Sequence, residues 1–148
     1  MAVYEYDRLL ATFRVSTSKF ALGDLPGTNA TPLGRLVVAK KIGGGQPAGM
    51  KFKSRRPTGE MVSVDAPGRD PIVTRILWLK GKEERNRRAY GRYIYIHGTP
   101  EESKLGHPAS YGCVRMASRD IIWLYDVVGK GARVEITTNR LPAGGPSR

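Results

Sequence analysis

Apolar and polar residues along the chain alternate over short stretches, which glycine, proline and charged residues separate from one another. Alternation with a period of two, bounded by residues of that kind, is typical of β-strands that bury one face. The pattern therefore predicts strands and turns for most of the chain. The predicted strands cover residues 3–6, 9–15, 35–41, 61–64, 72–80, 93–97 and 132–138.

The strand predicted at residues 93–97 has a clear alternation. Ile94 and Ile96 would point to one face of a sheet, and Tyr93, Tyr95 and His97 to the other. We therefore expect the two isoleucines to lie in the core. The two tyrosines are expected either to line a groove beside His97 or to pack against their neighbours.

One segment, residues 118–128, has helical periodicity instead. Ser118 is expected to cap this helix, Asp120 suits the positive end of its dipole, and Gly129 ends it. The expected core positions of the helix are Ile121, Leu124, Tyr125 and Val128. The pattern as a whole predicts a mainly β fold, a β-sandwich or small barrel with one packed α-helix.

The length of 148 residues, 40% of them hydrophobic, suits one domain with one core. We expect this domain to cover residues 1–138, with a charged loop at residues 81–91 and a flexible C-terminal tail at residues 139–148. No apolar run is long enough to span a bilayer. The N-terminus does not look like a secretory signal, because no basic stretch followed by an apolar region is present.

The net charge of +12, from 25 Lys and Arg against 13 Asp and Glu, favours polyanionic partners such as acidic wall polymers, anionic lipids or nucleic acid. The charges are spread along the chain, and no zinc-finger, basic-zipper or RNA-recognition motif occurs in the sequence. We therefore expect a solvated basic surface, which includes the run at residues 51–56, and no specific nucleic-acid binding.

The sequence contains one cysteine and two histidines, so neither an internal disulfide nor a usual zinc site is expected. A lone cysteine is most often a small buried hydrophobic residue. It becomes a nucleophile only as the thiolate, which requires a nearby imidazole, cation or N–H group. The Gly- and Pro-containing loop between His97 and Cys113 would allow these two side chains to meet.

Two neighbours of Cys113 fit the same chemistry. Gly112 has no side chain and would let backbone N–H groups approach a developing oxyanion. Arg115 would lie on the same side of an extended segment as Cys113, where it could stabilise a thiolate or bind a substrate carboxylate.

The sequence HGT at residues 97–99, followed by SYGCVRM at residues 110–116, resembles the L,D-transpeptidase catalytic domain of the YkuD type. The signature of that family is a His, a loop, and then Ser/Thr-His-Gly-Cys followed by a step with Arg or Asn. The sequence TPLG at residues 31–34 resembles the TPxG segment of the family, and residues 9–19 and 72–80 look like its short proteobacterial members. The likeness covers about residues 1–138.

The resemblance implies an acyl transfer that needs no metal or organic cofactor. Cys113 would attack the bond between the L-centre and D-Ala in a tetrapeptide stem of peptidoglycan and form a thioester. His97 would accept the thiol proton and later activate the acceptor amine, while N–H groups near Gly112 and Cys113 would hold the oxyanion. Ser110 would order the loop that carries the nucleophile.

The resemblance also implies a substrate site and a setting. Arg115 would hold the catalytic loop or the carboxylate of the stem, and Gly98, Thr99 and Tyr95 are further expected substrate-binding residues. The expected partners are peptidoglycan stem peptides and anionic wall polymers, and the expected protein is a monomer of the periplasm or cell envelope.

The chain departs from the family signature at Tyr111, where the family has a histidine. A phenol does not exchange protons near neutral pH as imidazole does, although it can donate a hydrogen bond and fill the space. We expect L,D-transpeptidation. The alternatives are an L,D-carboxypeptidase on the same fold and a catalytically weak wall-binding module.

Three further candidates are expected to lie outside the site. His107 is interpreted as a loop residue, although it could replace the missing motif histidine as a proton carrier. Trp78 and Trp123 are interpreted as core or groove-wall aromatics.

Overall fold

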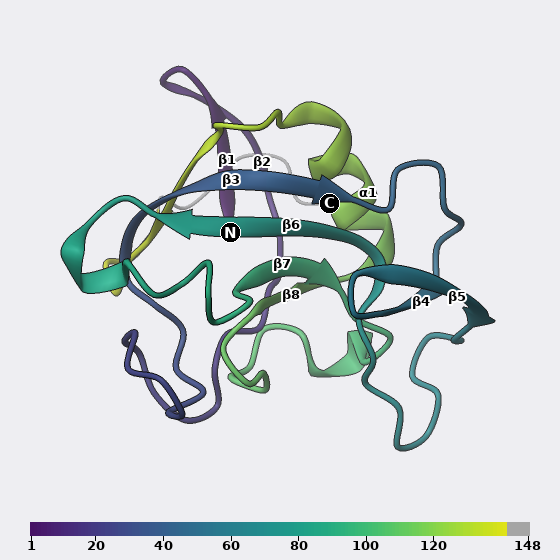
Figure 1. Ribbon diagram of the computed structural model, residues 1–148. Coiled ribbons are helices and arrows are strands. Elements are labelled where there is room, and N and C mark those ends of the chain that lie inside the picture. The colour runs from purple at the N-terminus through teal and green to yellow at the C-terminus, as the bar shows by residue number, and fades with distance from the viewer. Residues whose placement is uncertain (142–148) are drawn as a thin grey trace.

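The computed structural model describes residues 1–141 and shows a mainly β architecture with one α-helix (Figure 1). The elements are β1 (Ala2–Glu5), β2 (Arg8–Thr12), β3 (Gly34–Ile42), β4 (Met50–Lys53), β5 (Arg56–Met61), β6 (Val73–Gly81), β7 (Tyr95–Gly98), β8 (Val114–Met116), α1 (Ser118–Val127) and β9 (Arg133–Ile136), with short 3-10 turns at Glu84–Asn86 and Glu102–Lys104. The predicted mainly β fold with one packed helix is confirmed.

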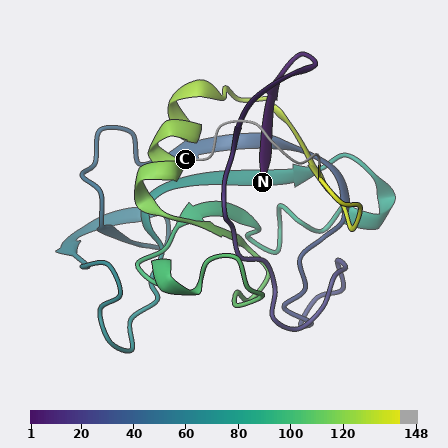
Figure 2. The same cartoon turned by 180° about the vertical axis from the view of Figure 1, so that it is seen from behind.

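The strands form one large sheet and one small hairpin. The seven-stranded sheet has the order β5-β4-β6-β3-β9, and β7 pairs with both β6 and β8. The pairing of β7 with β8 is parallel, whereas β6 pairs antiparallel with β3, β4 and β7. The hairpin of β1 and β2 lies on the same side of the sheet as α1 (Figure 2).

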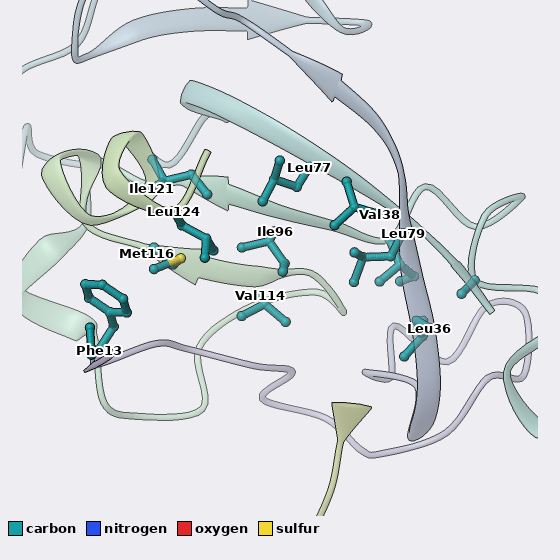
Figure 3. Packing of buried hydrophobic residues seen from close by; sticks show 13 residues of the cluster. Phe13, Leu36, Val38, Leu77, Leu79, Ile96, Val114, Met116, Ile121 and Leu124 are labelled. Carbon is teal, nitrogen blue, oxygen red and sulfur yellow. The ribbon is translucent and has the colours of Figure 1, made fainter. Parts of the chain in front are cut away.

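A hydrophobic core, which we call the helix-side core, fills the space between the sheet, α1 and β2 (Figure 3). Ile94 and Ile96 lie in it, as predicted, and each is 2% exposed. Its buried members are Ala11, Phe13, Leu36, Val38, Leu77, Leu79, Ala89, Ile94, Ile96, Val114, Met116, Ile121 and Leu124.

A second cluster lies on the opposite face of the same strands. This aromatic-side cluster consists of Phe52, Ile76, Trp78 and Tyr95. Tyr90 and Cys113 are among the partly buried residues packed against it. Because side chains alternate along a strand, β6 and β7 supply both clusters.

A bulge in β3 changes the face on which its side chains lie. Val38 pairs with Leu79, whereas Lys40, two residues later, pairs with Trp78, so the register shifts between them. An extra residue in one strand reverses which face the following side chains occupy. Lys40 consequently lies on the aromatic side, with its ammonium group 5.2 Å from the Trp78 ring centroid.

The strand predictions are confirmed for most of the sheet, with small shifts of the ends, but the strand predicted at residues 61–64 is wrong. Residues 62–64 follow the end of β5, and the preceding hairpin of β4 and β5 was missed, as was the short β8. Every residue of β5 is exposed. A strand without an apolar face produces no alternation of apolar and polar residues, so the pattern could not reveal it.

The helix is confirmed, but its predicted cap is wrong. The N-cap is Ala117, and Ser118 is the first helical residue. The Ser118 hydroxyl is instead 2.6 Å from the Thr74 hydroxyl on β6. At the other end, Lys41 donates hydrogen bonds to the carbonyls of Tyr125 and Val128, which have no partner within a helix.

The segment predicted as a charged loop, residues 81–91, contains one buried polar residue that binds it to the sheet. Asn86 is fully buried, and its side-chain amide donates to the carbonyls of Leu33 and Arg35. Most of the predicted C-terminal tail, residues 142–148, lies outside the described residues. Within residues 1–141, no helix has the length and apolar character needed to cross a bilayer.

Candidate active site

A pocket of about 140 Å³ opens on the aromatic side of the sheet. It brings together residues from the loop before β6, from β7, from the segment before β8 and from β8 itself. Its lining residues are Asp70, Ile72, His97, Ser110, Tyr111, Cys113 and Arg115. The cysteine and the histidine singled out in the sequence therefore share one cavity, although His97 lies in β7 and Cys113 in the segment just before β8.

Strand periodicity explains this meeting. In the parallel pairing of β7 with β8, His97 is opposite Arg115, and Ile96 is opposite Val114. Cys113 is two residues before Arg115 and therefore has the same orientation, toward the pocket. Ile96 and Val114 point the other way, into the helix-side core.

His97 is buried, with 5% of its surface exposed, and its ring orientation is fixed from behind. The Nδ1 atom is 2.7 Å from the carbonyl oxygen of Gly98. Because a carbonyl only accepts hydrogen bonds, Nδ1 carries the proton, and Nε2 keeps its lone pair. Burial lowers the pKa of His97 to about 4; the Gly98 hydrogen bond partly opposes this shift, and the charge of Arg115 adds to it. The imidazole is therefore neutral near pH 7.

The sulfur of Cys113 contacts the backbone on either side of Ile94. Sγ donates a hydrogen bond to the Tyr93 carbonyl at 3.4 Å and accepts one from the Tyr95 N–H at 3.3 Å. Burial raises the pKa of Cys113 to about 11, although the Tyr95 N–H and the charge of Arg92 act in the opposite direction. The resting site therefore holds a neutral thiol and a neutral imidazole.

The turn before Cys113 is held by hydroxyl groups. The Ser110 hydroxyl donates to the Cys113 carbonyl at 2.6 Å and accepts a hydrogen bond from the Gly112 N–H at 3.2 Å. Thr31 donates its hydroxyl to the Gly112 carbonyl at 3.0 Å. The Gly112 N–H, one of the expected oxyanion donors, is thus already engaged. Within residues 1–141, no protein group accepts a hydrogen bond from the Cys113 N–H.

Gly112 is required at its position for two reasons. Its φ of +119° lies in a region that L-residues rarely adopt. A Cβ atom there would also lie 3.0 Å from the carbonyl oxygen of Ala30. The close approach of the two loops therefore depends on the missing side chain.

A segment near the N-terminus, residues 16–19, runs along the turn before Cys113 (residues 110–112). Ser16 forms a bridge with Arg115 through backbone hydrogen bonds in both directions. The Ser110 N–H donates to the Thr17 carbonyl, and the Lys19 N–H donates to the Ser110 carbonyl. The sequence analysis missed this support, because the segment has neither an apolar face nor a motif of its own.

Arg115 lines the pocket but is 2% exposed, and its charge is already paired. Its Nη1 group forms ion pairs with Asp70 and with Glu101, the latter at 3.0 Å. Its Nε and Nη2 atoms are buried without a hydrogen-bond partner. Asp70, which the sequence analysis also missed, accepts a hydrogen bond from the Thr99 hydroxyl at 2.8 Å. Burial raises the pKa of Asp70, against the opposing effects of Thr99 and Arg115.

Tyr111, which stands where the family has histidine, is 61% exposed. Its hydroxyl accepts a hydrogen bond from the Lys19 ammonium at 3.3 Å, and its ring is 5.3 Å from the ring of Phe20. The Lys19 ammonium also lies 4.6 Å from the Tyr111 ring centroid. Tyr111 therefore forms part of the pocket wall and interacts with an exposed loop.

The other expected substrate-binding residues do not line the pocket. Gly98 and Thr99 are buried behind it, where a Cβ on Gly98 would lie 2.4 Å from the Val73 carbonyl oxygen. Tyr95 is 4% exposed, and its ring packs against Trp78. These residues support His97, Asp70 and Cys113 from behind.

The remaining candidates are also outside the pocket. His107 is exposed on the loop between β7 and β8. Trp78 belongs to the aromatic-side cluster, and Trp123 packs against Phe13 at a ring distance of 5.3 Å. Among the described residues, no group of three or more His, Cys, Asp or Glu side chains is arranged to hold a metal ion.

Comparison with known proteins gives one consistent family. The YkuD family, described as the L,D-transpeptidase catalytic domain, matches residues 1–136. The YkuD protein of Bacillus licheniformis is 34% identical over 87 residues, which are 59% of this chain and 48% of that protein. The chain thus spans about half the length of this curated relative.

Solved structures share the fold. An L,D-transpeptidase from Mycobacterium smegmatis superposes with a TM-score of 0.56 at 16% identity, over 93% of this chain and 53% of the other. The L,D-transpeptidase LdtMt1, solved in complex with imipenem, superposes with a TM-score of 0.56 at 18% identity, over 92% of this chain and 53% of the other.

Proposed function

The chain belongs to the YkuD family of L,D-transpeptidase catalytic domains, and on that premise we propose that it is a cysteine acyltransferase that acts on peptidoglycan stem peptides in the cell envelope. Cys113 is the nucleophile and His97 is the base. The observation that carries this proposal is that the only cysteine of the chain and a buried, neutral histidine line the same pocket.

The first half-reaction forms a thioester. The thiol proton of Cys113 passes to Nε2 of His97 while Sγ attacks the carbonyl carbon of the bond between the L-centre and D-Ala in a tetrapeptide stem. The C–N bond then breaks, and the same proton moves from His97 to the amine of the leaving D-Ala. In the second half-reaction, an acceptor amine attacks the thioester carbonyl carbon and gives a proton to Nε2 of His97. The C–S bond then breaks, and His97 returns that proton to the sulfur, which restores the thiol.

The electrostatics support proton transfer during attack rather than a preformed ion pair. With the pKa of His97 near 4 and that of Cys113 near 11, thiolate and imidazolium would not coexist in the resting site. Sγ must also leave the Tyr93 carbonyl before it can deliver its proton to His97. Substrate binding would cause Sγ to leave the Tyr93 carbonyl and its proton to pass to His97, because the substrate carbonyl carbon in the pocket accepts the electron pair of the sulfur.

The oxyanion of the tetrahedral intermediate would be held by the Cys113 N–H, since the Gly112 N–H already donates to Ser110. Arg115 would hold Asp70 and strand β8 in place through its ion pair with Asp70. Its unpaired Nε and Nη2 groups are the donors that a stem carboxylate would meet if it reached the base of the pocket.

Intact-protein mass spectrometry with imipenem tests the proposal, because a β-lactam carbonyl would acylate the same sulfur. We expect one adduct on the wild-type chain and none on Cys113→Ala. An unmodified wild-type chain, or an equal adduct on the Cys113→Ala variant, would contradict the nucleophile assignment.

A tetrapeptide stem with and without a D-amino acid in excess then distinguishes the outcomes. Exchange of the terminal D-Ala for the added D-amino acid is expected of a transpeptidase, and simple loss of D-Ala of a carboxypeptidase.

Exposed Tyr111 and the net charge of +12 favour a second candidate, a wall-binding module with little catalysis. Such a module would sediment with purified sacculi equally well as wild type and as Cys113→Ala. Its binding would weaken as salt is added, because the attraction is between exposed charges.

A further inference from the structure

Two segments that meet on the aromatic side of the sheet adopt an unfavourable backbone conformation. Tyr93, just before β7, has a φ of +59°. Ser54 and Arg55, which form the two-residue turn between β4 and β5, have φ values of +48° and +64°. Residues with a Cβ rarely occupy this left-handed region, and a hairpin turn of this kind favours Asn-Gly. Such conformations persist where surrounding contacts enforce them, and they gather at functional sites.

The two segments contact each other through the side chain of Arg55. Its guanidinium carbon lies 5.1 Å from the Tyr93 ring centroid and 5.0 Å from the Trp78 ring centroid. Its Nη1 group donates a hydrogen bond to the Tyr95 hydroxyl at 3.3 Å. A planar guanidinium can lie over aromatic rings and donate in its own plane at the same time, which a lysine ammonium cannot do.

The two tyrosines that Arg55 contacts are the ones whose backbone holds the nucleophile. The Tyr93 carbonyl accepts the hydrogen bond from Sγ of Cys113, and the Tyr95 N–H donates one to the same atom. Of these two backbone contacts, the one from the Tyr95 N–H favours the thiolate. The conformation of the chain at Tyr93 and Tyr95 therefore sets both the position and the reactivity of the sulfur.

We propose that Arg55 is a positioning residue for the nucleophile: the turn between β4 and β5 carries it onto Tyr93 and Tyr95, and this contact fixes the two backbone groups that hold the Cys113 sulfur. The inference rests on the proposed role of Cys113. It adds a residue of the β4–β5 hairpin at the edge of the sheet (Figure 1), which does not line the pocket, to the groups on which the reaction depends.

The turn itself provides a matched pair of variants. Glycine adopts positive φ without strain, so Arg55→Gly removes the side chain while it relaxes the turn. Ser54→Gly relaxes the same turn and leaves the Arg55 contacts in place. Arg55→Lys keeps the charge but loses the planar group. Thermal unfolding of each variant shows whether the fold is retained.

The measurement is the rate of Cys113 alkylation by iodoacetamide between pH 7 and 10, which requires no turnover. We expect Arg55→Gly to react about two- to tenfold more slowly than Ser54→Gly at each pH, the range for weakening one hydrogen bond to the thiolate. Arg55→Lys should lie between them. The alkylation profile should move to higher pH in Arg55→Gly, whereas a purely structural role would change the melting temperature and leave the profile in place.

An alkylation profile of Arg55→Gly that coincides with that of Ser54→Gly, or one that moves to lower pH, would overturn the proposal. The second outcome would mean that Arg55 only excludes water from the sulfur. If the wild-type chain forms no imipenem adduct but the two glycine variants still differ in alkylation, the proposed function fails and the positioning role of Arg55 stands.

Discussion

The two faces of the strands β6 and β7, with the residues just before β7, differ in almost every property, although alternate residues of the same backbone form both. On the helix side, Leu77, Leu79, Ile94 and Ile96 are at most 2% exposed and surrounded by aliphatic side chains. On the aromatic side, the alternate positions carry the aromatic side chains of Trp78 and Tyr95 and the imidazole of His97, and the thiol of Cys113 packs against this side. Nearby, this side also has the positive φ of Tyr93 and cations stacked on Trp78.

The difference indicates a division of roles, in which one face fixes the backbone and the other carries the side chains that we propose to react. A close-packed aliphatic face fixes the backbone, because displacing it opens cavities. Polar groups on the other face then have fixed positions, and burial shifts the pKa of His97 and of Cys113 away from neutrality in opposite directions. Changes on the helix side should therefore reduce stability, and changes on the aromatic side should reduce reactivity.

The largest expected effect is a loss of acylation rate on substitution of His97, on the aromatic side. His97→Gln should slow acylation of Cys113 by imipenem by about 10²- to 10⁴-fold, because the sulfur loses the base that accepts its proton. Stopped-flow or mass-spectrometric acylation rates measure this change. Alkylation of the free thiol by iodoacetamide, which draws on the thiolate already present, should change far less. Equal losses in both reactions would point to a collapsed pocket.

A substitution in the helix-side core should have the opposite effect, a loss of stability with little change in the acylation rate. Leu77→Ala should lower the free energy of unfolding by about 2–5 kcal/mol, since the fully buried side chain leaves a cavity in the helix-side core. Urea denaturation measures the loss. The acylation rate of the folded fraction should remain within about threefold of wild type. A much slower acylation by fully folded Leu77→Ala would contradict the idea that the two faces have separate roles.

Acid should destabilise the protein through His97. Its pKa is about 4 in the folded chain and about 6.5 when exposed, so the unfolded state binds the additional proton between these values. This contribution to stability is complete above pH 6.5 and is lost as the pH falls toward 4, by about 3 kcal/mol in total. Comparing urea unfolding of wild type and His97→Gln at pH 7 and pH 4.5 isolates it. An equal acid sensitivity of both proteins would exclude His97 as the cause.

The smallest effect is expected at the contact between the turn before Cys113 and the loop that carries Thr31. Thr31→Val removes the hydroxyl that accepts from the Ser18 N–H and donates to the Gly112 carbonyl. The buried partners are left unpaired, which should cost about 1–3 kcal/mol of stability. Acylation should slow modestly, because the turn at Gly112 loosens. Thr31→Ser, which retains the hydroxyl, is the control and should behave as wild type in both measurements.

Several parts of the fold and the site could be predicted from local sequence. Alternation at residues 93–97 correctly separated the core isoleucines from Tyr95 and His97, because side chains on a strand repeat with a period of two whatever the strand packs against. The helix followed from its own periodicity. The motif at residues 110–116 identified the family, and the TPLG segment, here anchored through Thr31, supported it.

The tertiary structure alone determined the groups that surround these residues. Asp70 pairs with Arg115, residues 16–19 support the turn before Cys113, and Arg55 contacts Tyr93 and Tyr95. None of these partners is close to the motif in sequence, and a charged residue has the same local pattern whether it is solvated or paired. Pairing between distant segments depends on how loops close and strands pack, and the pKa of a group depends on its burial. For that reason the sequence was enough to propose Cys113 and His97 as the reacting residues, whereas the folded chain determined their protonation states and the groups that support them.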